Sequence, residues 1–412
     1  MTDQPLAGRT VIDLTTALAG PYATLLLAGL GATVIKVENP TTGGDTSRNN
    51  APYLGRDGLA LGRKHDDDMS VSMLVRGRGK LSVTLNLKDP RAKAVFTDLV
   101  RDADVLVENY SPGVTSRLGI DYAAVRELNP RLVYTSISGF GTQGGPGSGK
   151  AMDSIIQALS GVMMTAGEPG GDPVRFGLPI GDLLAPLFAV VGTVSALLQA
   201  ETTGQGQHVD VSMLGALTSL VACEPFDAFE AVGLPQRTGS LVPRLAPFGI
   251  LPTADGHIAL CAPTDSFARG VLRAMGREDL VDDERYRTRD ERVRRADELH
   301  ALIGDWCRAL PSADVVDRLS EHGVPAAEVR EPREAVRDPL VRARREVVPI
   351  THPRHGAVAD LSATGLPIVF SGASVGLDGP APALGEHNDH VYRELLGYSE
   401  DTVAALAADS VI

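Results

Sequence analysis

The sequence predicts an α/β protein with a doubly wound, Rossmann-like large domain and a smaller inserted α+β domain. Two observations favour this fold class. Short apolar runs alternate with helical segments over about the first 140 residues, which is typical of a parallel sheet covered by helices. A second stretch, 255–325, combines a short strand with helical segments and follows a Pro- and Gly-rich segment. The 412 residues are enough for two or three domains.

The first forty residues predict a strand, a helix and a second strand. Residues 10–14 and 32–38 are apolar runs, and residues 22–30 have helical spacing that ends at Gly31. A strand–helix–strand unit of this length requires parallel strands. The glycines do not form the G-x-G-x-x-G pattern, so the unit lacks the fingerprint of a dinucleotide site.

The alternation continues with strands at 81–87, 104–108 and 131–137 and helices at 89–101 and 122–128. Ligands of doubly wound domains bind beyond the carboxyl ends of the strands, so the segments that leave these ends are candidates for the ligand site. They are 37–40, 108–113 and 136–141. Residues 43–79 break the pattern, which indicates a mobile lid or disorder and leaves both open.

The rest of the chain predicts the domain boundaries. Two apolar helices between 153 and 199 flank a Gly/Pro loop at 167–182, and a turn then leads into a strand that ends at 211. We expect the large domain to comprise 1–200 and 350–412, with a strand at 365–370 and helices at 388–396 and 400–408. The small domain is expected at 226–325, with a strand at 257–261 and helices at 267–275, 292–308 and 312–322. Linkers are expected at 201–225 and 325–350.

Composition excludes several classes of protein. The net charge of −13 disfavours nucleic acid as a partner, because phosphate binding needs a basic surface. No apolar run reaches the roughly 18 residues of a spanning helix without interruption, so no membrane association is expected. Three cysteines without a C-x-x-C pair and no visible signal peptide favour the cytoplasm. The nine scattered histidines predict no metal site.

Asp182 is the most informative single residue, and the pattern around it permits two interpretations. It lies between apolar residues and follows Gly181. The carboxylate could satisfy the free amides at the start of a helix. It could equally act as a nucleophile on an acyl group, with Gly181 permitting close approach of a ligand. The spacing alone favours the first interpretation.

Twelve segments together resemble the class III CoA-transferases, a family that includes formyl-CoA transferase, carnitine CoA-transferase and alpha-methylacyl-CoA racemase. They follow the family's order through nearly the whole chain. The segments are 5–14, 19–21, 30–38, 79–88, 103–113, 118–119, 128–130, 138–141, 153–161, 181–182, 203–207 and 384–387.

The resemblance implies a chemistry and a set of site residues. Asp182 corresponds to the family's catalytic aspartate, which attacks an acyl-CoA thioester to give a mixed anhydride and then an aspartyl-CoA thioester. CoA and acyl-CoA would be substrates together with a carboxylic acid, with no permanently bound cofactor. An interlocked homodimer is also implied. The residues implied near CoA are Val37, Glu38, Lys80, Asn109, Tyr110, Arg117 and Lys150, and the same region contains Arg76 and Arg78.

Two departures from the family's patterns limit the substrate. The racemase has a histidine at the position of Met152, and methionine cannot move a proton, so transfer is favoured over racemisation. Leu18 stands where formyl-CoA transferases have glutamine, which disfavours oxalate and formate. An acyl-CoA racemase or isomerase acting at the alpha carbon stays an alternative, as does a catalytically silent CoA-binding protein. The roles of Met152 and Asp153 stay open.

Overall fold

The computed structural model describes residues 4–145, 149–242 and 244–412, which form two compact units. The first unit comprises the described residues up to Ser160 together with Phe176–Cys223 and Val336–Ile412. The second comprises Gly161–Arg175 and the described part of Glu224–Ala335. Much of the stretch 201–225, expected as a linker, is a strand and a helix of the first unit.

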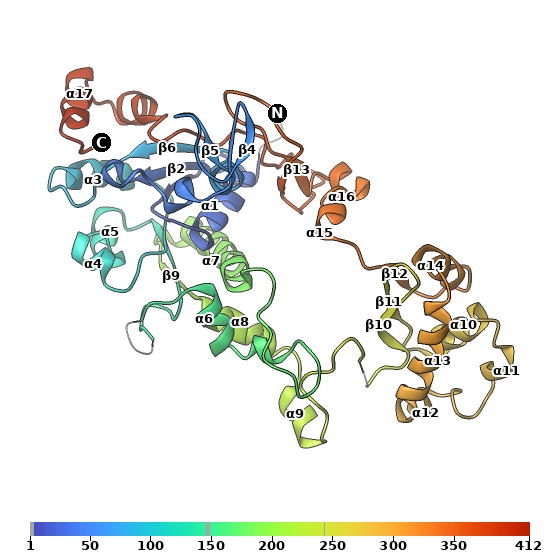
Figure 1. Ribbon diagram of the computed structural model, residues 1–412. Coiled ribbons are helices and arrows are strands. Elements are labelled where there is room, and N and C mark those ends of the chain that lie inside the picture. Colours follow the sequence, from blue (N-terminus) through green and yellow to red (C-terminus); the bar gives the residue numbers. More distant parts are fainter. Residues whose placement is uncertain (1–3, 146–148, 243) are drawn as a thin grey trace. The chain divides into compact units, whose positions relative to one another are not determined.

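Within its described residues, the first unit contains the predicted parallel sheet (Figure 1). The six strands follow the order β6-β2-β1-β7-β8-β9, and every neighbouring pair is parallel. The strand order reverses between β1 and β7, and this switch point is where doubly wound domains bind ligands. The strands are β1 (Thr10–Asp13), β2 (Thr33–Glu38), β6 (Lys80–Thr84), β7 (Val105–Glu108), β8 (Val133–Ser138) and β9 (His208–Ser212).

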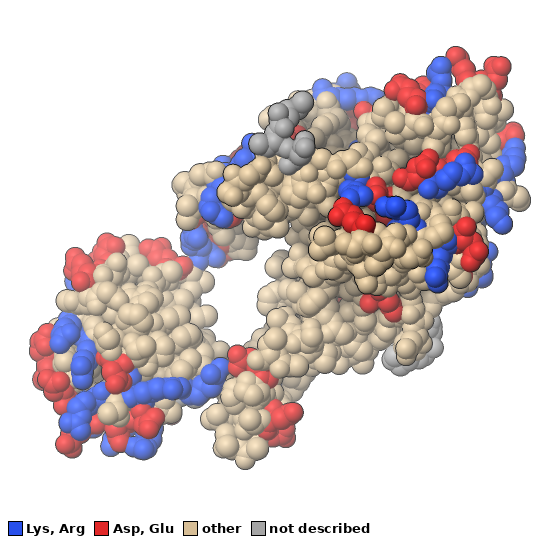
Figure 2. Space-filling model, turned by 180° about the vertical axis from the view of Figure 1, so that it is seen from behind, with Lys and Arg blue, Asp and Glu red and all other residues tan. Residues whose placement is uncertain are grey.

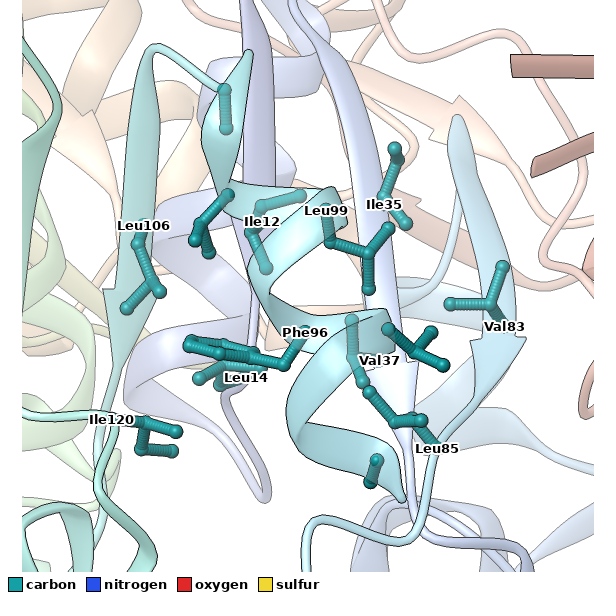
Figure 3. Packing of buried hydrophobic residues seen from close by; sticks show 14 of the residues in the cluster. Ile12, Leu14, Ile35, Val37, Val83, Leu85, Phe96, Leu99, Leu106 and Ile120 are labelled. Atoms are coloured by element: carbon teal, nitrogen blue, oxygen red, sulfur yellow. The ribbon is translucent and has the colours of Figure 1, made fainter. Parts of the chain in front are cut away.

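Alternation along the strands separates an apolar face of this sheet from a partly polar one. Ile12, Ile35 and Val83 point into a core built with Phe96 and Leu99 of α3 (Figure 3). Since successive side chains of a strand point to opposite faces, the intervening residues of β1, β2 and β6 lie on the other face. That face carries buried charges and is covered by α1 and α7.

The helices of the first unit follow the predicted alternation closely, although η4 is a π-helix rather than an α-helix. They are α1 (Ala19–Gly29), α2 (Val71–Arg76), α3 (Ala92–Arg101), α4 (Val114–Leu118), α5 (Tyr122–Leu128), α6 (Asp153–Leu159), α7 (Ile180–Thr203), α8 (Met213–Val221), α16 (Pro339–Ala343), α17 (Glu400–Ala408), the π-helix η4 (Asp389–Leu395), and the short 3-10 helices η1 (Pro40–Thr42) and η2 (Thr46–Asn49).

Residues 43–79 contain short strands and helices, so of the two alternatives left open, a mobile lid and disorder, disorder does not describe this stretch. The strands β3 (Tyr53–Gly55), β4 (Gly58–Ala60) and β5 (Met69–Ser70) make a small antiparallel sheet that precedes α2. Leu54 and Leu74 pack in a small core with Ile350, which is nearly 300 residues away in the sequence. Strands this short, stabilised by such distant contacts, leave no periodic signal in the sequence.

The strand predicted at 365–370 is absent from the described structure. The chain instead pairs β13 (Val347–Pro349) with β14 (Ser362–Thr364), and residues 365–370 have no regular secondary structure. Pro367 interrupts this apolar run and lacks the N–H that a strand would use. Ile368 and Val369 are exposed.

The second unit has its own core of strands and helices, and it includes Gly161–Arg175, which was expected in the large domain. Its sheet is antiparallel with the order β10-β11-β12, and helices α10, α13 and α14 pack against it around Ile258 and Leu260. Its elements are β10 (Phe248–Pro252), β11 (His257–Cys261), β12 (Ala326–Glu328), η3 (Val162–Met164), α9 (Phe226–Ala231), α10 (Asp265–Ala274), α11 (Glu278–Val281), α12 (Arg289–Arg294), α13 (Ala296–Arg308), α14 (Ser312–Glu321) and α15 (Pro332–Ala335).

Candidate active site

Asp182 lies in the first turn of α7, at the positive end of the helix dipole. The helix begins at Ile180, two residues before the end of the predicted loop. Burial of the carboxyl and the negative charge of Asp153 together raise the pKa of Asp182 to about 6, although the positive charge of Arg76 opposes the shift. The carboxyl group is therefore ionised at neutral pH but titrates close to it.

A second carboxylate, that of Asp153, holds the backbone around Asp182. Asp153 is 8% exposed and lies in the first turn of α6. Its Oδ1 accepts a hydrogen bond from the backbone N–H of Gly181 at 2.8 Å and a longer one from that of Asp182 at 3.4 Å. The loop that carries Asp182 is thus tied to α6 by its backbone, which leaves the Asp182 side chain available.

Gln157, one turn after Asp153 on α6, extends this attachment along the same loop. Its amide nitrogen donates to Asp153 Oδ2 at 2.7 Å and to the carbonyl of Leu178 at 3.1 Å. Its amide oxygen accepts from the N–H of Phe176 at 2.9 Å. Neither the role of Asp153 nor that of Gln157 was predicted from the sequence. The spacing of an acid and an amide four residues apart on one helix is the signal that could have indicated them.

A buried ionic network lies on the polar face of the sheet, at the carboxyl ends of β1 and β2. Its ion pairs are Lys80–Asp13 at 3.0 Å, Lys36–Asp45 at 2.8 Å and Arg48–Glu38 at 2.6 Å. In each pair both side chains are nearly or fully buried. Pairing of this kind satisfies charges that would otherwise be costly to bury.

Lys80, implied near CoA, is committed to this network. Its ammonium donates to Asp13, to the carbonyl of Pro21 at 2.9 Å and to the hydroxyl of Thr24 at 2.7 Å, which uses all three of its donors. Burial lowers the pKa of Lys80 to about 8 even though Asp13 opposes that shift. No part of its side chain is exposed to a ligand.

Val37 and Glu38 also point into the protein. Val37 belongs to the apolar core, and the Glu38 carboxylate accepts hydrogen bonds from Arg48 and from Ser82 Oγ at 2.7 Å. Only the backbone of these two residues is therefore left for a ligand, and the resemblance implied a backbone contact.

Asn109 joins the two strands that flank the switch point. Its side-chain oxygen accepts from the N–H of Thr16 at 2.8 Å, and its amide nitrogen donates to the carbonyl of Thr16 at 2.8 Å. The carboxyl ends of β7 and β1 are thus fixed together. Both polar groups of the Asn109 side chain thus bind the backbone of Thr16 at the carboxyl ends of these strands.

Tyr110 lines a cavity of about 280 Å³ at the carboxyl ends of β7 and β8. The cavity also includes Ser136 and His208, whose side chains hydrogen-bond at 2.9 Å. Arg117, on α4, and Lys150 are exposed. Lys150 follows shortly after residues 146–148, which lie outside the described residues.

A cavity of about 750 Å³ lies elsewhere in the first unit. Arg48, Asp67 and His352 are among its lining residues, and neither Asp182 nor any of the residues implied near CoA is. Figure 2 shows basic and acidic side chains interspersed on the visible face, so no single cationic patch marks a CoA site there.

Comparison with known proteins identifies the family. A model described as CoA-transferase family III matches residues 6–388, and the chain belongs to this family. It is a CoA-transferase, as the resemblance predicted.

Named relatives and a solved structure agree with this assignment. The chain is 34% identical to a succinate–glutarate CoA-transferase of Agrobacterium fabrum, over 96% of this chain and 98% of the relative. It is 36% identical to a succinyl-CoA:mesaconate CoA-transferase of Haloarcula marismortui, over 93% and 94%. The crystal structure of a CAIB/BAIF family protein from Brucella suis superimposes with a TM-score of 0.82 at 30% identity, covering 95% of this chain and 100% of that one.

Proposed function

We propose that the protein moves CoA from an acyl-CoA donor to a carboxylic acid through a covalent intermediate on Asp182. The supporting observation is the setting of this carboxylate. It is ionised at neutral pH, partly buried, and fixed through its backbone by Asp153 while its own oxygens stay available. A carboxylate in a partly desolvated position is a stronger nucleophile than one in water.

Each step of the proposed reaction exchanges one bond to an acyl carbon for another. Asp182 Oδ attacks the thioester carbonyl, the C–S bond breaks, and the electron pair leaves with the CoA thiolate. The thiolate then attacks Asp182 Cγ and releases the donor acid, which leaves an aspartyl-CoA thioester. The acceptor carboxylate attacks Cγ and frees the thiolate again. Thiolate attack on the new acyl carbon then restores the Asp182 carboxylate.

For the CoA contacts we propose Tyr110, Arg117 and Lys150, together with the backbone of Val37 and Glu38 and the second N–H of the Asn109 amide, which Thr16 does not use. The exposed guanidinium of Arg117 and ammonium of Lys150 are suited to the phosphates of CoA. Lys80 is left out because its three donors are taken by protein groups. Its proposed role is to stabilise the sheet edge beneath the site.

The relatives' names point to small organic acids as the second substrate. They are described as acting with succinate, glutarate, mesaconate, oxalate and D-citramalate, all of which carry two carboxylates. A small organic acid is therefore proposed as acceptor for this enzyme. Leu18 disfavours oxalate within that group.

The covalent intermediate can be trapped. Incubation with an acyl-CoA, followed by hydroxylamine or borohydride and peptide mass spectrometry, should modify the peptide that contains Asp182. An Asp182→Ala variant should lose both the label and the activity, whereas Asp314→Asn, an exposed carboxylate of α14, should keep both. Full transferase activity in Asp182→Ala would overturn the proposal. Deuterium incorporation at the alpha carbon without an acceptor acid would indicate an isomerase instead.

A further inference from the structure

We propose that Arg76 binds a second carboxylate of the acyl group transferred at Asp182, so that the enzyme favours dicarboxylic over monocarboxylic acids. The inference rests on the proposed function, because it concerns the acyl group that Asp182 would carry. The starting observation is that the guanidinium of Arg76, near the proposed nucleophile, is incompletely paired with other groups of the protein.

Arg76 is the last residue of α2, and its side chain is partly buried. Its Nε is fully shielded from solvent and has no hydrogen-bond partner among the described residues. Buried donors on charged groups are nearly always paired in folded proteins, so an unpaired guanidinium N–H calls for a partner that the chain does not supply. Burial correspondingly lowers the pKa of Arg76.

Two carboxylates lie close enough to interact electrostatically with Arg76, namely Asp45 and Asp182. The charge of Asp45 is already paired, although its buried Oδ2, like Arg76 Nε, has no hydrogen-bond partner among the described residues. Asp45 pairs with Lys36 at 2.8 Å and accepts hydrogen bonds from the N–H groups of Ala17 at 2.9 Å and Ser47 at 2.8 Å. Asp45 therefore shares its charge with Lys36 and does not fully neutralise Arg76.

Asp182 does not neutralise Arg76 either. A carboxylate tightly paired with arginine has a lowered pKa, whereas burial and Asp153 raise that of Asp182 despite Arg76. The reaction makes the imbalance larger. Once Asp182 is an anhydride or a thioester, it carries no charge, and Arg76 loses its interaction with the nucleophile.

A second carboxylate on the acyl group would supply a negative charge to pair with Arg76 while Asp182 is an anhydride or a thioester. The acyl group is attached to Asp182 in the anhydride, so its far end stays within reach of the neighbouring guanidinium. A planar guanidinium binds a carboxylate through two parallel hydrogen bonds, and Nε is one of the donors that can take part. A monocarboxylic acid would leave the same donor buried and unpaired.

Paired acceptor acids test the proposal. Succinate against butyrate, and glutarate against pentanoate, are compared as acceptors with one acyl-CoA donor. In the native enzyme we expect kcat/KM to favour each diacid. In Arg76→Met the diacid value should fall about 10- to 100-fold, the range that loss of a hydrogen bond to a charged group gives. The monoacid value should change by less than about threefold.

Three comparisons keep the outcome decisive. Arg76→Lys keeps the charge and should retain part of the diacid preference, and Arg101→Met removes an exposed arginine of α3 and should leave the preference unchanged. An equal loss for diacids and monoacids in Arg76→Met, or no loss at all, would overturn the inference. If Arg76→Met does not fold, Arg76→Gln is measured instead. Loss of the preference for diacids in Arg76→Gln would support the inference, and an unchanged preference would overturn it. Trapping of Asp182 with butyryl-CoA in the same variant tests the proposed function separately.

Discussion

At the scale of single residues, Asp182 and Asp153 have different functions in the candidate site. Asp182 carries the carboxylate that we propose as the nucleophile, and Asp153 accepts the backbone hydrogen bonds that fix its position. The same closeness makes Asp153 raise the pKa of Asp182, in addition to the larger effect of burial. The two effects of Asp153, geometric and electrostatic, can be separated by substitution.

Asp153→Asn should move the acidic limb of the pH profile. Native kcat/KM should fall about tenfold per pH unit below about 6, because only the ionised Asp182 carboxylate attacks. Asparagine keeps an oxygen that can accept from Gly181 N–H but removes the negative charge, so the pKa of Asp182 should decrease. The inflection in a kcat/KM profile should therefore shift to lower pH. An unchanged inflection would contradict the electrostatic role, and Asp314→Asn provides the control.

At the scale of elements, strand alternation places the buried charges of the first unit. Asp13 of β1 pairs in register with Lys36 of β2, and both lie on the sheet face opposite Ile12 and Ile35. Lys80 of β6 reaches the same face and binds Asp13. The buried ionic network therefore supports the site without contacting a ligand. Arg117 on α4 is exposed, so its side chain is accessible to a ligand.

Two substitutions distinguish these roles. Lys80→Met should lower the free energy of unfolding by about 3–5 kcal/mol, because it leaves the Asp13 carboxylate buried without its partner. Arg117→Met should leave stability within about 0.5 kcal/mol and instead raise KM for acyl-CoA. Urea unfolding and steady-state kinetics on both variants are the measurements. A stable Lys80→Met enzyme with a raised KM for acyl-CoA would indicate instead that Lys80 contacts CoA.

At the scale of the whole molecule, the first unit leaves a large apolar surface on α7. Val191 is 65% exposed and Leu198 is 66% exposed, and Leu187 and Phe188 are exposed as well. In the described part of the chain, α7 is the one helix long and apolar enough to cross a membrane, on length and composition alone. Exposed apolar patches of this kind mark surfaces that another molecule covers. We propose that a second copy of the chain covers α7 in the homodimer implied by the family resemblance.

Val191→Asp should weaken that homodimer, because it places a charge in the centre of the apolar face. Light scattering after size-exclusion chromatography should give a dimer for the native protein and a larger monomer fraction for the variant. Val232→Asp, at an exposed apolar position of the second unit, is the matched control. A monomeric native protein, or partition of the native protein into lipid vesicles, would contradict the proposal.

Most of the fold could be predicted from local sequence. Alternating apolar strands and helices such as α3 and α5 carry their own periodicity, so the parallel sheet and its order of elements were predictable. The three-stranded sheet within 43–79 was not, because its core forms with Ile350 and Ala363. The prediction of a strand at 365–370 was wrong for a related reason. An apolar run forms a strand only where another strand is available to pair with it, and residues 365–370 have none in the described structure.

The sequence by itself determined the fold class, the family and the position of Asp182, since each depends on the order and type of residues along the chain. Only the tertiary structure decided what surrounds that carboxylate. It brings Asp153 to the backbone of Gly181, buries Lys80 against Asp13, and leaves the Nε of Arg76 unpaired near Asp182. Burial and pairing set the charge and reach of each group, and both arise from contacts between residues that are distant in the sequence.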